Sequence, residues 1–517
     1  MRRALDRLAR SFWIGVVAGT AATLMLFAAR LTVGVAMPQE ALFEQLVRLL
    51  PPSIFVLLLT VLQHLAKPLG FAGAIAASLL GFGVGGAIYE VAAPEHRVAR
   101  AVLGLLTAVM TWATFMYLLP APGGVATLGA PDRTSAWTRA LALAAASAAY
   151  ALLLMRLVER PVSLTPALGR DSGVIPRRAL VRRSVLGLLV FVAASRAGVR
   201  AQPEPGGLSA ATSGGVPLLP AMPPEVTLAG RFYQVSKNFP SDPSVDAATW
   251  ALEVTGLVVR PVRLSFRDLV AAAPAVEQYQ TLECISNEVG GDLIGNARWT
   301  GVRVRDILRL AGVRPEARTI IWRSADGYSE AVSIDVAMDA AALLAFGMNG
   351  APLPPQHGAP VRVLLPNRYG MKQPKWLISI VVAGREVDGD HARRGWSTQA
   401  VVKPASAFVA AARAESGGDA VWLGGWAFAG SRGVARVELS DDGGTSWTPA
   451  AVKESLGANC WQFWQATWTP RAPGEYRLLV RALDGAGELQ PARFRRAPDG
   501  AEGYHEIRVR AIAQKES

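Results

Sequence analysis

The chain of 517 residues has little cysteine and little charge. Cysteine occurs only at positions 284 and 460, which excludes a disulfide framework and any metal site built of cysteines alone. Charged residues make up 18% of the chain, against 51% for hydrophobic residues. This balance is too apolar for an ordinary soluble protein, so the sequence predicts segments that cross a membrane.

Histidine is also scarce, with five in the whole chain. A haem held by a helical bundle needs paired axial ligands, and the N-terminal 200 residues offer only His64 and His96. We therefore expect no haem in this chain. The formal net charge is +13, but many arginines flank apolar runs. This pattern favours membrane topology over nucleic-acid binding, and we expect no nucleic acid as a partner.

Four long apolar runs occupy residues 12–36, 69–91, 101–119 and 138–155. Each is close to the roughly 20 residues that a helix needs to cross a hydrocarbon core of about 30 Å. A shorter apolar run, 51–66, begins and ends next to proline. The sequence therefore predicts four or five crossings before residue 156.

Arginine placement decides between these two counts. Arginines concentrate in the first ten residues and again in 156–183, and the positive-inside rule places both segments in the cytoplasm. An even number of crossings must separate them. We therefore predict four spans and interpret 51–66 as interfacial or re-entrant, preceded by the amphipathic stretch Gln39–Leu50.

A further crossing follows at Arg182-Arg183 and the short apolar run Val185–Ala194. A twin arginine before such a run resembles an export signal for a folded domain, and the alternative is a charge cluster beside an ordinary fifth span. In both cases residues after about 200 lie on the extracytoplasmic, periplasmic side of the inner membrane. Residues 1–200 are thus predicted to form an all-α membrane anchor, embedded in the lipid bilayer.

Residues 201–225 are rich in Pro, Gly and Ser and indicate a flexible linker. Residues 226–400 mix strand-like and helix-like stretches, which predicts a mixed α/β domain. The predicted strands are Trp250–Val254, Tyr279–Cys284, Thr319–Arg323, Val361–Leu365 and Leu377–Val382. The predicted helices are Phe266–Ala272, Val304–Ala311 and Ala337–Phe346.

Residues 401–517 contain short strands separated by turns, which is typical of a β-sandwich. The predicted strands are Val421–Ala429, Ala435–Ser440, Trp461–Thr469, Glu475–Ala482 and His505–Ala511. The turn Asp441–Gly444 suits a hairpin. Cys460 is most simply a free thiol, buried or partly exposed.

Cys284 ends a predicted strand and is followed by Gly290-Gly291 and Gly295. A thiolate is a soft metal ligand, and glycines allow backbone amides to approach a bound group. Taken alone, a single cysteine is more often a buried structural residue. One thiolate cannot hold a metal by itself, so a metal at Cys284 would need a cofactor to complete its coordination.

Three ordered stretches carry a resemblance: Leu282–Arg298, Met348–Arg362 and Tyr369–Trp376. They resemble the oxidoreductase molybdopterin-binding domain of the sulfite oxidase superfamily. The region after 400 is similar to the same superfamily's immunoglobulin-like second domain, which often mediates dimerisation. The anchor with its internal twin arginine resembles a membrane-bound branch. The resemblance implies three parts: an all-α anchor, a sulfite-oxidase-like α/β domain and an immunoglobulin-like β-sandwich.

The resemblance also implies roles for particular residues. Cys284 is the expected molybdenum ligand and catalytic residue. The residues expected to bind the molybdopterin are Tyr233, Ser236, Asp326, His357, Arg362, Gln373, Pro374 and Lys375. A phosphorylated pterin is anionic, and Arg and Lys are suited to binding it. Singly, His357 and Lys375 would be ordinary surface groups, so their order and spacing support the assignment.

The implied activity is a two-electron transfer of an oxygen atom to or from a small-molecule substrate. Electrons would pass to or from a separate cytochrome or quinone, and a homodimer is possible. The sequence departs from the sulfite enzymes at Glu288, where they carry an arginine, and at Phe346, where they carry a tyrosine. Two alternatives stay open: a sulfoxide reductase of the same superfamily and a non-catalytic binding protein that has lost the cofactor.

Overall fold

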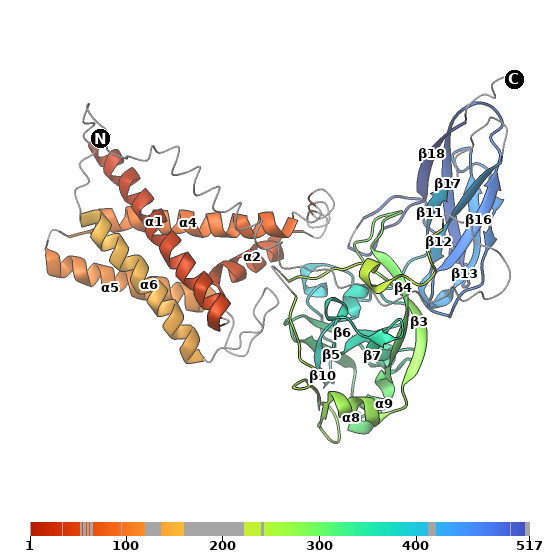
Figure 1. The fold of residues 1–517 in the computed structure, drawn as a ribbon, viewed down its shortest axis with the longest axis horizontal. Coiled ribbons are helices and arrows are strands. Elements are labelled where there is room, and N and C mark those ends of the chain that lie inside the picture. Colours follow the sequence, from red (N-terminus) through yellow and green to blue (C-terminus); the bar gives the residue numbers. More distant parts are fainter. Residues whose placement is uncertain are drawn as a thin grey trace. The chain divides into compact units, whose positions relative to one another are not determined.

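The computed structural model describes residues 2–118 apart from 34, 95 and most of 52–65, then 136–159, 222–411 apart from 239–241, and 420–511 apart from 497. The chain divides into two compact units, and all described strands belong to the second (Figure 1). The predicted twin arginine, the fifth crossing and most of the linker lie outside the described residues.

The first unit is helical, with α1 (Arg2–Val33), α2 (Pro38–Leu49), α4 (Ala66–Ala92), α5 (Arg97–Leu118) and α6 (Ala136–Glu159). Every one of these except α2 is long and apolar enough to cross a membrane, which agrees with the four spans predicted from the sequence. The helix α2 corresponds to the predicted amphipathic stretch. Most of 51–66 lies outside the described residues, so its interfacial placement stays a prediction.

Helices α1 and α4 pack closely because small residues line their crossing. A Cβ atom on Gly15 would lie 2.3 Å from the Phe82 carbonyl oxygen, and one on Gly86 would lie 2.3 Å from that of Ser11. The hydroxyl of Tyr150 in α6 donates to the Phe82 carbonyl at 2.8 Å. The bundle therefore holds together through backbone proximity and a buried hydrogen bond as well as apolar contacts.

The α/β domain contains two five-stranded sheets. The first has the order β2-β1-β10-β5-β6, in which only β1 and β10 are parallel. Its strands are β1 (Ala251–Gly256), β2 (Val262–Ser265), β5 (Thr319–Ser324), β6 (Ser329–Ser333) and β10 (Leu377–Ala383). The helices α8 (Phe266–Ala272) and α9 (Val304–Ala311) have the predicted bounds. The predicted strands Trp250–Val254, Thr319–Arg323 and Leu377–Val382 are also confirmed.

The second sheet has the order β3-β4-β7-β8, and β9 pairs with β7. Its strands are β3 (Val276–Glu283), β4 (Ile294–Arg303), β7 (Leu343–Met348), β8 (Ala351–Pro352) and β9 (Arg362–Leu364). Strand β3 ends one residue before Cys284, and β9 lies within the predicted strand Val361–Leu365.

The predicted helix Ala337–Phe346 is wrong. The helix α10 (Ile334–Met338) ends early, at a turn in which the Asp339 carboxylate accepts from the Ala341 amide at 2.7 Å. Strand β7 then begins, and its side chains are buried on both faces. A short apolar run buried on both faces lacks the alternation that distinguishes a strand from a helix in sequence.

Residues after 400 form a β-sandwich of two four-stranded sheets, β11-β12-β16-β15 and β14-β13-β17-β18. The longer strands are β11 (Ala405–Ala411), β12 (Val421–Phe428), β13 (Val434–Ser440), β16 (Gln462–Trp468), β17 (Gly474–Asp484) and β18 (His505–Ala511). The short strands β14 (Thr448–Pro449) and β15 (Ala451–Val452) complete the sheets. All five predicted strands and the hairpin turn are present, and Cys460 is a buried free thiol.

The sandwich and the α/β domain share an apolar cluster. Ile285, next to Cys284, packs in this cluster with Trp426 and Trp461 of the sandwich. The amide of Thr281 donates to the Asn459 carbonyl at 2.9 Å, and the amide of Trp461 donates to the Thr281 hydroxyl at 2.9 Å. The strand that leads to Cys284 is therefore held on one side by the sandwich.

Candidate active site

Cys284 is almost completely buried, with 9% of its surface exposed, directly after β3. Its backbone amide donates to the Leu293 carbonyl at 2.9 Å, and its carbonyl accepts from the Asn287 amide at 2.9 Å. The Ser286 hydroxyl lies 3.1 Å from the thiol sulfur. Burial raises the pKa of the Cys284 thiol, and the contact with Ser286 opposes that rise. A metal ion would displace the thiol proton, because only the thiolate is a ligand.

A buried carboxyl group precedes the cysteine, and the sequence analysis missed it. Glu283 is 5% exposed and accepts from the Asn287 side-chain amide at 3.0 Å. Its second carboxylate oxygen has no hydrogen-bond partner among the described residues. Burial raises the pKa of Glu283 to about 7. The signal in the sequence was an acidic residue at the end of an otherwise buried strand.

Arg362 connects the loop that contains His357 with the loop that contains Gln373. One guanidinium nitrogen donates to the His357 carbonyl at 3.1 Å, and another donates to the Gln373 carbonyl at 3.3 Å. The guanidinium also lies 5.3 Å from the centre of the Trp299 ring, a cation–π contact. Its Nε is buried and has no hydrogen-bond partner among the described residues. Burial lowers the pKa of Arg362 to about 10, which leaves it cationic at neutral pH.

Phe232 and Tyr233 belong to the N-terminal segment of the α/β domain, and they bring this segment close to His357 and Cys284. The Phe232 ring lies 5.5 Å from the ring of His357. His357 is 1% exposed, and its Nε2 must carry a proton because its contact at 2.8 Å is the Ala229 carbonyl. Tyr233 lies within electrostatic range of Cys284, and burial raises the pKa of its phenol well above the usual value. Tyr233 is therefore a hydrogen-bond donor at neutral pH.

The loops that contain Asp326, His357 and Lys375 are linked by backbone hydrogen bonds. The Ala325 amide, next to Asp326, donates to the Trp376 carbonyl at 2.8 Å, and the Trp376 amide donates to the Gly358 carbonyl at 3.1 Å. Asp326 is buried and caps its own turn by accepting from the Tyr328 amide at 3.0 Å. These bonds place Asp326, His357 and Lys375 in neighbouring loops, as the resemblance implied.

The remaining predicted residues differ in burial and in the hydrogen bonds that they form. Lys375 is partly exposed, donates to the Gln356 carbonyl at 3.0 Å and lies 4.2 Å from the centre of the Trp376 ring. The Gln373 side chain points into the protein, where its amide donates to Arg368 and its oxygen accepts from Leu365. The buried carbonyl of Pro374 accepts from the amide of Val363. The Gln373 side chain is therefore engaged within the protein, and its contact with a cofactor stays a prediction.

Ser236 is partly buried, and its place in the site stays a prediction.

The expectation that Phe346 takes the place of a substrate-side tyrosine is corrected by the structure. Phe346 packs against Phe266 in the core on the face of β7 that also carries Leu344. Leu343 and Ala345 face the opposite side, where Leu282, Phe232 and Tyr233 lie. Because side chains alternate along a strand, Phe346 points away from Cys284 and does not line the substrate side.

The negative charge of Glu288 is paired with a cation of the sandwich. Its carboxylate forms an ion pair at 3.2 Å with Arg496 of the sandwich. Two other cations of the domain pair with different carboxylates: Arg298 pairs with Glu277, and Lys372 pairs with Glu330. Sequence reasoning missed Arg496 because it lies 208 positions along the chain from Glu288.

The side chains fit an anionic pterin that carries a metal. Arg362 offers a buried guanidinium nitrogen with spare donor capacity, and Lys375 offers an ammonium at the edge of the site. Tyr233 adds a neutral donor, and Cys284 supplies the soft ligand. No group of three or more His, Cys, Asp or Glu residues suited to a metal occurs among the described residues, so the other ligands of a metal at Cys284 would come from the cofactor.

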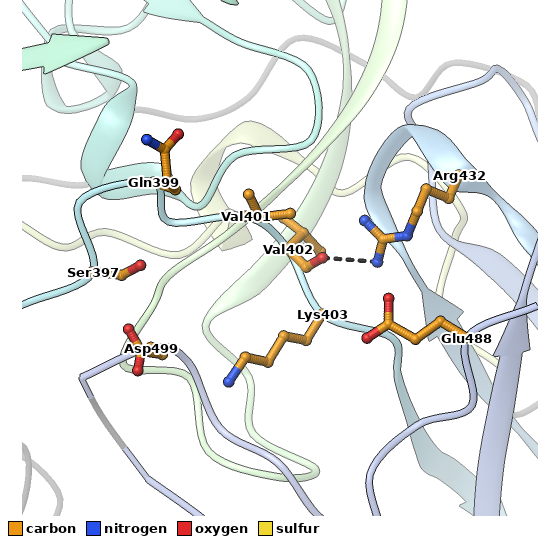
Figure 2. Close-up of a pocket in the computed structure, with 8 residues that line it drawn as sticks. All are labelled: Ser397, Gln399, Val401, Val402, Lys403, Arg432, Glu488 and Asp499. Atoms are coloured by element: carbon orange, nitrogen blue, oxygen red, sulfur yellow. Dashed lines mark hydrogen bonds between the residues drawn. The ribbon is translucent and has the colours of Figure 1, made fainter. Parts of the chain in front are cut away.

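A hollow of about 340 Å³ lies elsewhere in this unit (Figure 2). Its lining includes Lys403 and Arg432, and Arg432 donates to the Val402 carbonyl at 2.9 Å. Both cations already pair with carboxylates, Lys403 with Glu502 and Arg432 with Asp484. None of the predicted site residues lines this hollow, so it is not the candidate active site.

Comparison with known protein families identifies the same two domains that the structure shows. The oxidoreductase molybdopterin binding domain matches residues 239–391, and the Mo-co oxidoreductase dimerisation domain matches residues 395–511. A nitrate reductase [NAD(P)H] of Hordeum vulgare is 31% identical over 321 residues, which cover 50% of this chain and 36% of that protein. The mitochondrial sulfite oxidase of Drosophila melanogaster is 29% identical over 267 residues, which cover 43% of this chain and 47% of that protein.

The uncharacterized oxidoreductase YuiH of Bacillus subtilis is 36% identical over 151 residues, which cover 29% of this chain and 74% of that protein. The chain spans 36% and 47% of the lengths of the nitrate reductase and the sulfite oxidase. Both domain matches and the strand-end cysteine lead to the same conclusion. The chain belongs to the sulfite oxidase superfamily of molybdenum-cofactor oxidoreductases.

Proposed function

We propose that the chain is a membrane-anchored, extracytoplasmic oxidoreductase that transfers an oxygen atom to or from a small substrate and exchanges electrons with a separate cytochrome or quinone. The observation that carries the proposal is the buried Cys284 thiol, which follows the buried Glu283 and lies within electrostatic range of Tyr233. When bound, the molybdenum–pterin group would supply the two-electron chemistry. The matched dimerisation domain supports a homodimer.

The chain's own residues would hold and shield that group. Arg362 and Lys375 would neutralise the negative charge of the pterin's phosphate end, and Asp326 and His357 would fix its orientation by hydrogen bonds. Tyr233 would donate a hydrogen bond at the metal end, because its phenol keeps its proton. The burial of Cys284 would limit the access of water to a group bound there.

The direct test is the metal and pterin content of the purified full-length chain. We expect about one molybdenum and one pterin per chain, because the single thiolate of Cys284 and the cations Arg362 and Lys375 can hold one cofactor. Elemental analysis and the fluorescence of the oxidised pterin measure the two independently. A chain that carries neither, after expression in a host that makes the cofactor, would favour the non-catalytic binding protein.

The topology rests on the arginine distribution and on four helices suited to crossing a membrane. Reporter fusions after Gly169 and Gly230 are expected to report opposite sides of the membrane, with Gly169 in the cytoplasm. Replacing Arg182-Arg183 with two lysines is expected to retain the catalytic domain inside if export uses the twin-arginine route. Reporters on the same side at both positions would refute the topology.

Charge beside the site favours a neutral substrate over sulfite, and this supports a sulfoxide reductase as the second candidate. Glu288, in the loop that follows Cys284, and Arg496 of the sandwich form a pair with no net charge. Two unit charges about 4 Å apart interact by about 4 kcal/mol at an effective dielectric constant of about 20. The sulfite enzymes carry an arginine at the position of Glu288. Without that arginine, the site should attract a doubly charged anion more weakly.

We expect a sulfite kcat/KM below about 10⁴ M⁻¹s⁻¹, the lower end of the usual enzyme range. Glu288→Gln is expected to raise it and Glu288→Arg to raise it further, because the first change removes a negative charge beside Arg496 and the second also adds a positive one. Activity on neutral sulfoxides should change much less. The measurement is steady-state kinetics with an artificial electron carrier, and equal responses of both substrates would contradict the charge argument.

A further inference from the structure

A buried ion pair lies behind the loop that carries Gln373 and Lys375. The Lys372 ammonium donates to the Glu330 carboxylate at 2.7 Å and to the Ala331 carbonyl at 3.1 Å. Lys372 is 1% exposed, and Glu330 is 0% exposed. Lys372 belongs to the short 3-10 helix Gly370–Lys372, whereas Glu330 belongs to strand β6 of the first sheet. The pair therefore connects the loop to a rigid strand.

Tyr328 and His391 extend this pair into a network. The Tyr328 hydroxyl lies 3.0 Å from the second Glu330 oxygen, 2.7 Å from the Met371 carbonyl and 2.8 Å from Nδ1 of His391. Burial lowers the pKa of His391 to about 3, so its ring is neutral at physiological pH. The hydroxyl has one hydrogen to donate, and it can accept one from the His391 ring.

The segment after β10 closes over the network. A Cβ atom on Gly389 would lie only 1.6 Å from a Glu330 carboxylate oxygen, so this backbone is in direct contact with the ion pair. The Asp390 amide donates to the Ser329 carbonyl at 2.8 Å, and the Asp390 carboxylate accepts from the Ser329 amide at 2.8 Å. The pair is therefore enclosed by β6, the loop and this segment.

Stability alone gives little reason for such a pair. Removing two charges from water costs about as much as their attraction returns, and apolar side chains of similar size stabilise a core equally well or better. What an enclosed pair does provide is a fixed position, because a charge that leaves its partner would be buried alone. Lys372 is thereby held in one place, together with the loop residues on either side of it.

That loop contacts the candidate site on its other side. A Cβ atom on Gly370 would lie 2.9 Å from the Tyr233 hydroxyl and 3.4 Å from the Glu283 carbonyl oxygen. Gln373 directly follows Lys372, and its carbonyl accepts a hydrogen bond from the Arg362 guanidinium at 3.3 Å. A shift of the loop would therefore move Tyr233 and Arg362 together.

We propose that Glu330, Lys372 and Tyr328 are positioning residues that fix the Tyr369–Lys375 loop and thereby determine how firmly the molybdenum–pterin group is retained. The proposal rests on the proposed function, since it presupposes that the chain binds this group. It goes further by assigning retention to residues that would not touch the group. The relevant readout is the rate at which the purified protein loses pterin and molybdenum, measured apart from activity.

The experiment compares Glu330→Gln, Lys372→Met and the double variant Glu330→Met/Lys372→Met in the full-length chain. Each single variant leaves one buried group without its partner, so both Tm and cofactor retention should fall. The double variant removes both charges, so its Tm should recover most of the way to wild type. Its pterin loss should stay at least about threefold faster than wild type, because the loop has lost its fixed anchor.

Tyr328→Phe provides an independent variant with little change in packing. It removes one hydroxyl that joins Glu330, Met371 and His391, and we expect pterin loss to be about twofold faster with a moderate fall in Tm, because buried polar groups lose a hydrogen-bond partner. The matched control is Glu438→Met/Arg481→Met, which removes a partly buried ion pair inside the sandwich. This control should alter Tm without changing pterin loss.

A double variant and a Tyr328→Phe variant that both lose pterin at the wild-type rate would overturn the proposal. Pterin loss that follows Tm across all variants, the control included, would show a structural role only and would also overturn it. A wild-type chain without pterin or molybdenum would instead reject the proposed function, so the two failures are distinguishable.

Discussion

Replacing Cys284 with serine is expected to lower turnover at least about 100-fold, the upper end of what losing even an outer-shell partner of a metal site costs. A serine hydroxyl is a harder and less acidic ligand than a thiol, and it does not bind a soft site in the same way. Burial leaves little room for another ligand to replace it, since Cys284 is only 9% exposed. Steady-state kinetics and the visible sulfur-to-metal absorption of the purified protein measure the effect.

Cys460→Ser is the matched control for that experiment. Cys460 is also buried, and burial raises the pKa of its thiol to about 12, so it is an inert side chain in the sandwich. We expect a modest fall in Tm and unchanged turnover per molybdenum. Wild-type turnover in Cys284→Ser, or an equal loss in both variants, would remove Cys284 from its assigned role.

The second large effect is expected for Arg362→Lys. Lysine keeps the positive charge, but its single ammonium cannot bridge the His357 and Gln373 carbonyls and lie over Trp299 in the way that a planar guanidinium does. Each lost hydrogen bond to a charged group costs about 1.5–3 kcal/mol. We therefore expect a fall in Tm of several degrees and less than half the wild-type pterin content.

Arg368→Lys is the comparison for Arg362→Lys, because Arg368 is only partly buried and its guanidinium bonds only to the neighbouring Asn367 carbonyl among the described hydrogen bonds. It should retain wild-type pterin content. Thermal unfolding and pterin fluorescence provide the two measurements. An Arg362→Lys protein with full pterin and wild-type Tm would show that positive charge alone is sufficient at this position.

The sequence predicted most elements whose hydrophobic pattern is regular. The two catalytic-domain helices Phe266–Ala272 and Val304–Ala311 and the sandwich strands were predicted close to their observed bounds. The failure at Ala337–Phe346 arose where an apolar run is buried on both faces, so that no alternation distinguishes strand from helix. Strand β4 was missed because it follows the glycine-rich stretch after Cys284.

For the site, local motifs predicted the residues but not the contacts between them. Cys284, His357 and Arg362 are recognisable from the residues around them, and the structure brings their loops together. The Glu288–Arg496 pair and the Lys372–Glu330 pair each join segments that are distant along the chain. Such pairs depend on how sheets and loops fold back on one another, which no local pattern encodes.

The shared cluster between the α/β domain and the sandwich has a consequence for how the protein can be divided. Residue 400 separates two domains in sequence, but Thr281 and Ile285 depend on Asn459 and Trp461 across that boundary. A fragment that ends near residue 400 would expose Ile285 and its apolar neighbours to water, one residue away from Cys284. The sandwich therefore covers apolar surface of the α/β domain, and that domain without its sandwich is expected to be less stable and less soluble than the intact chain.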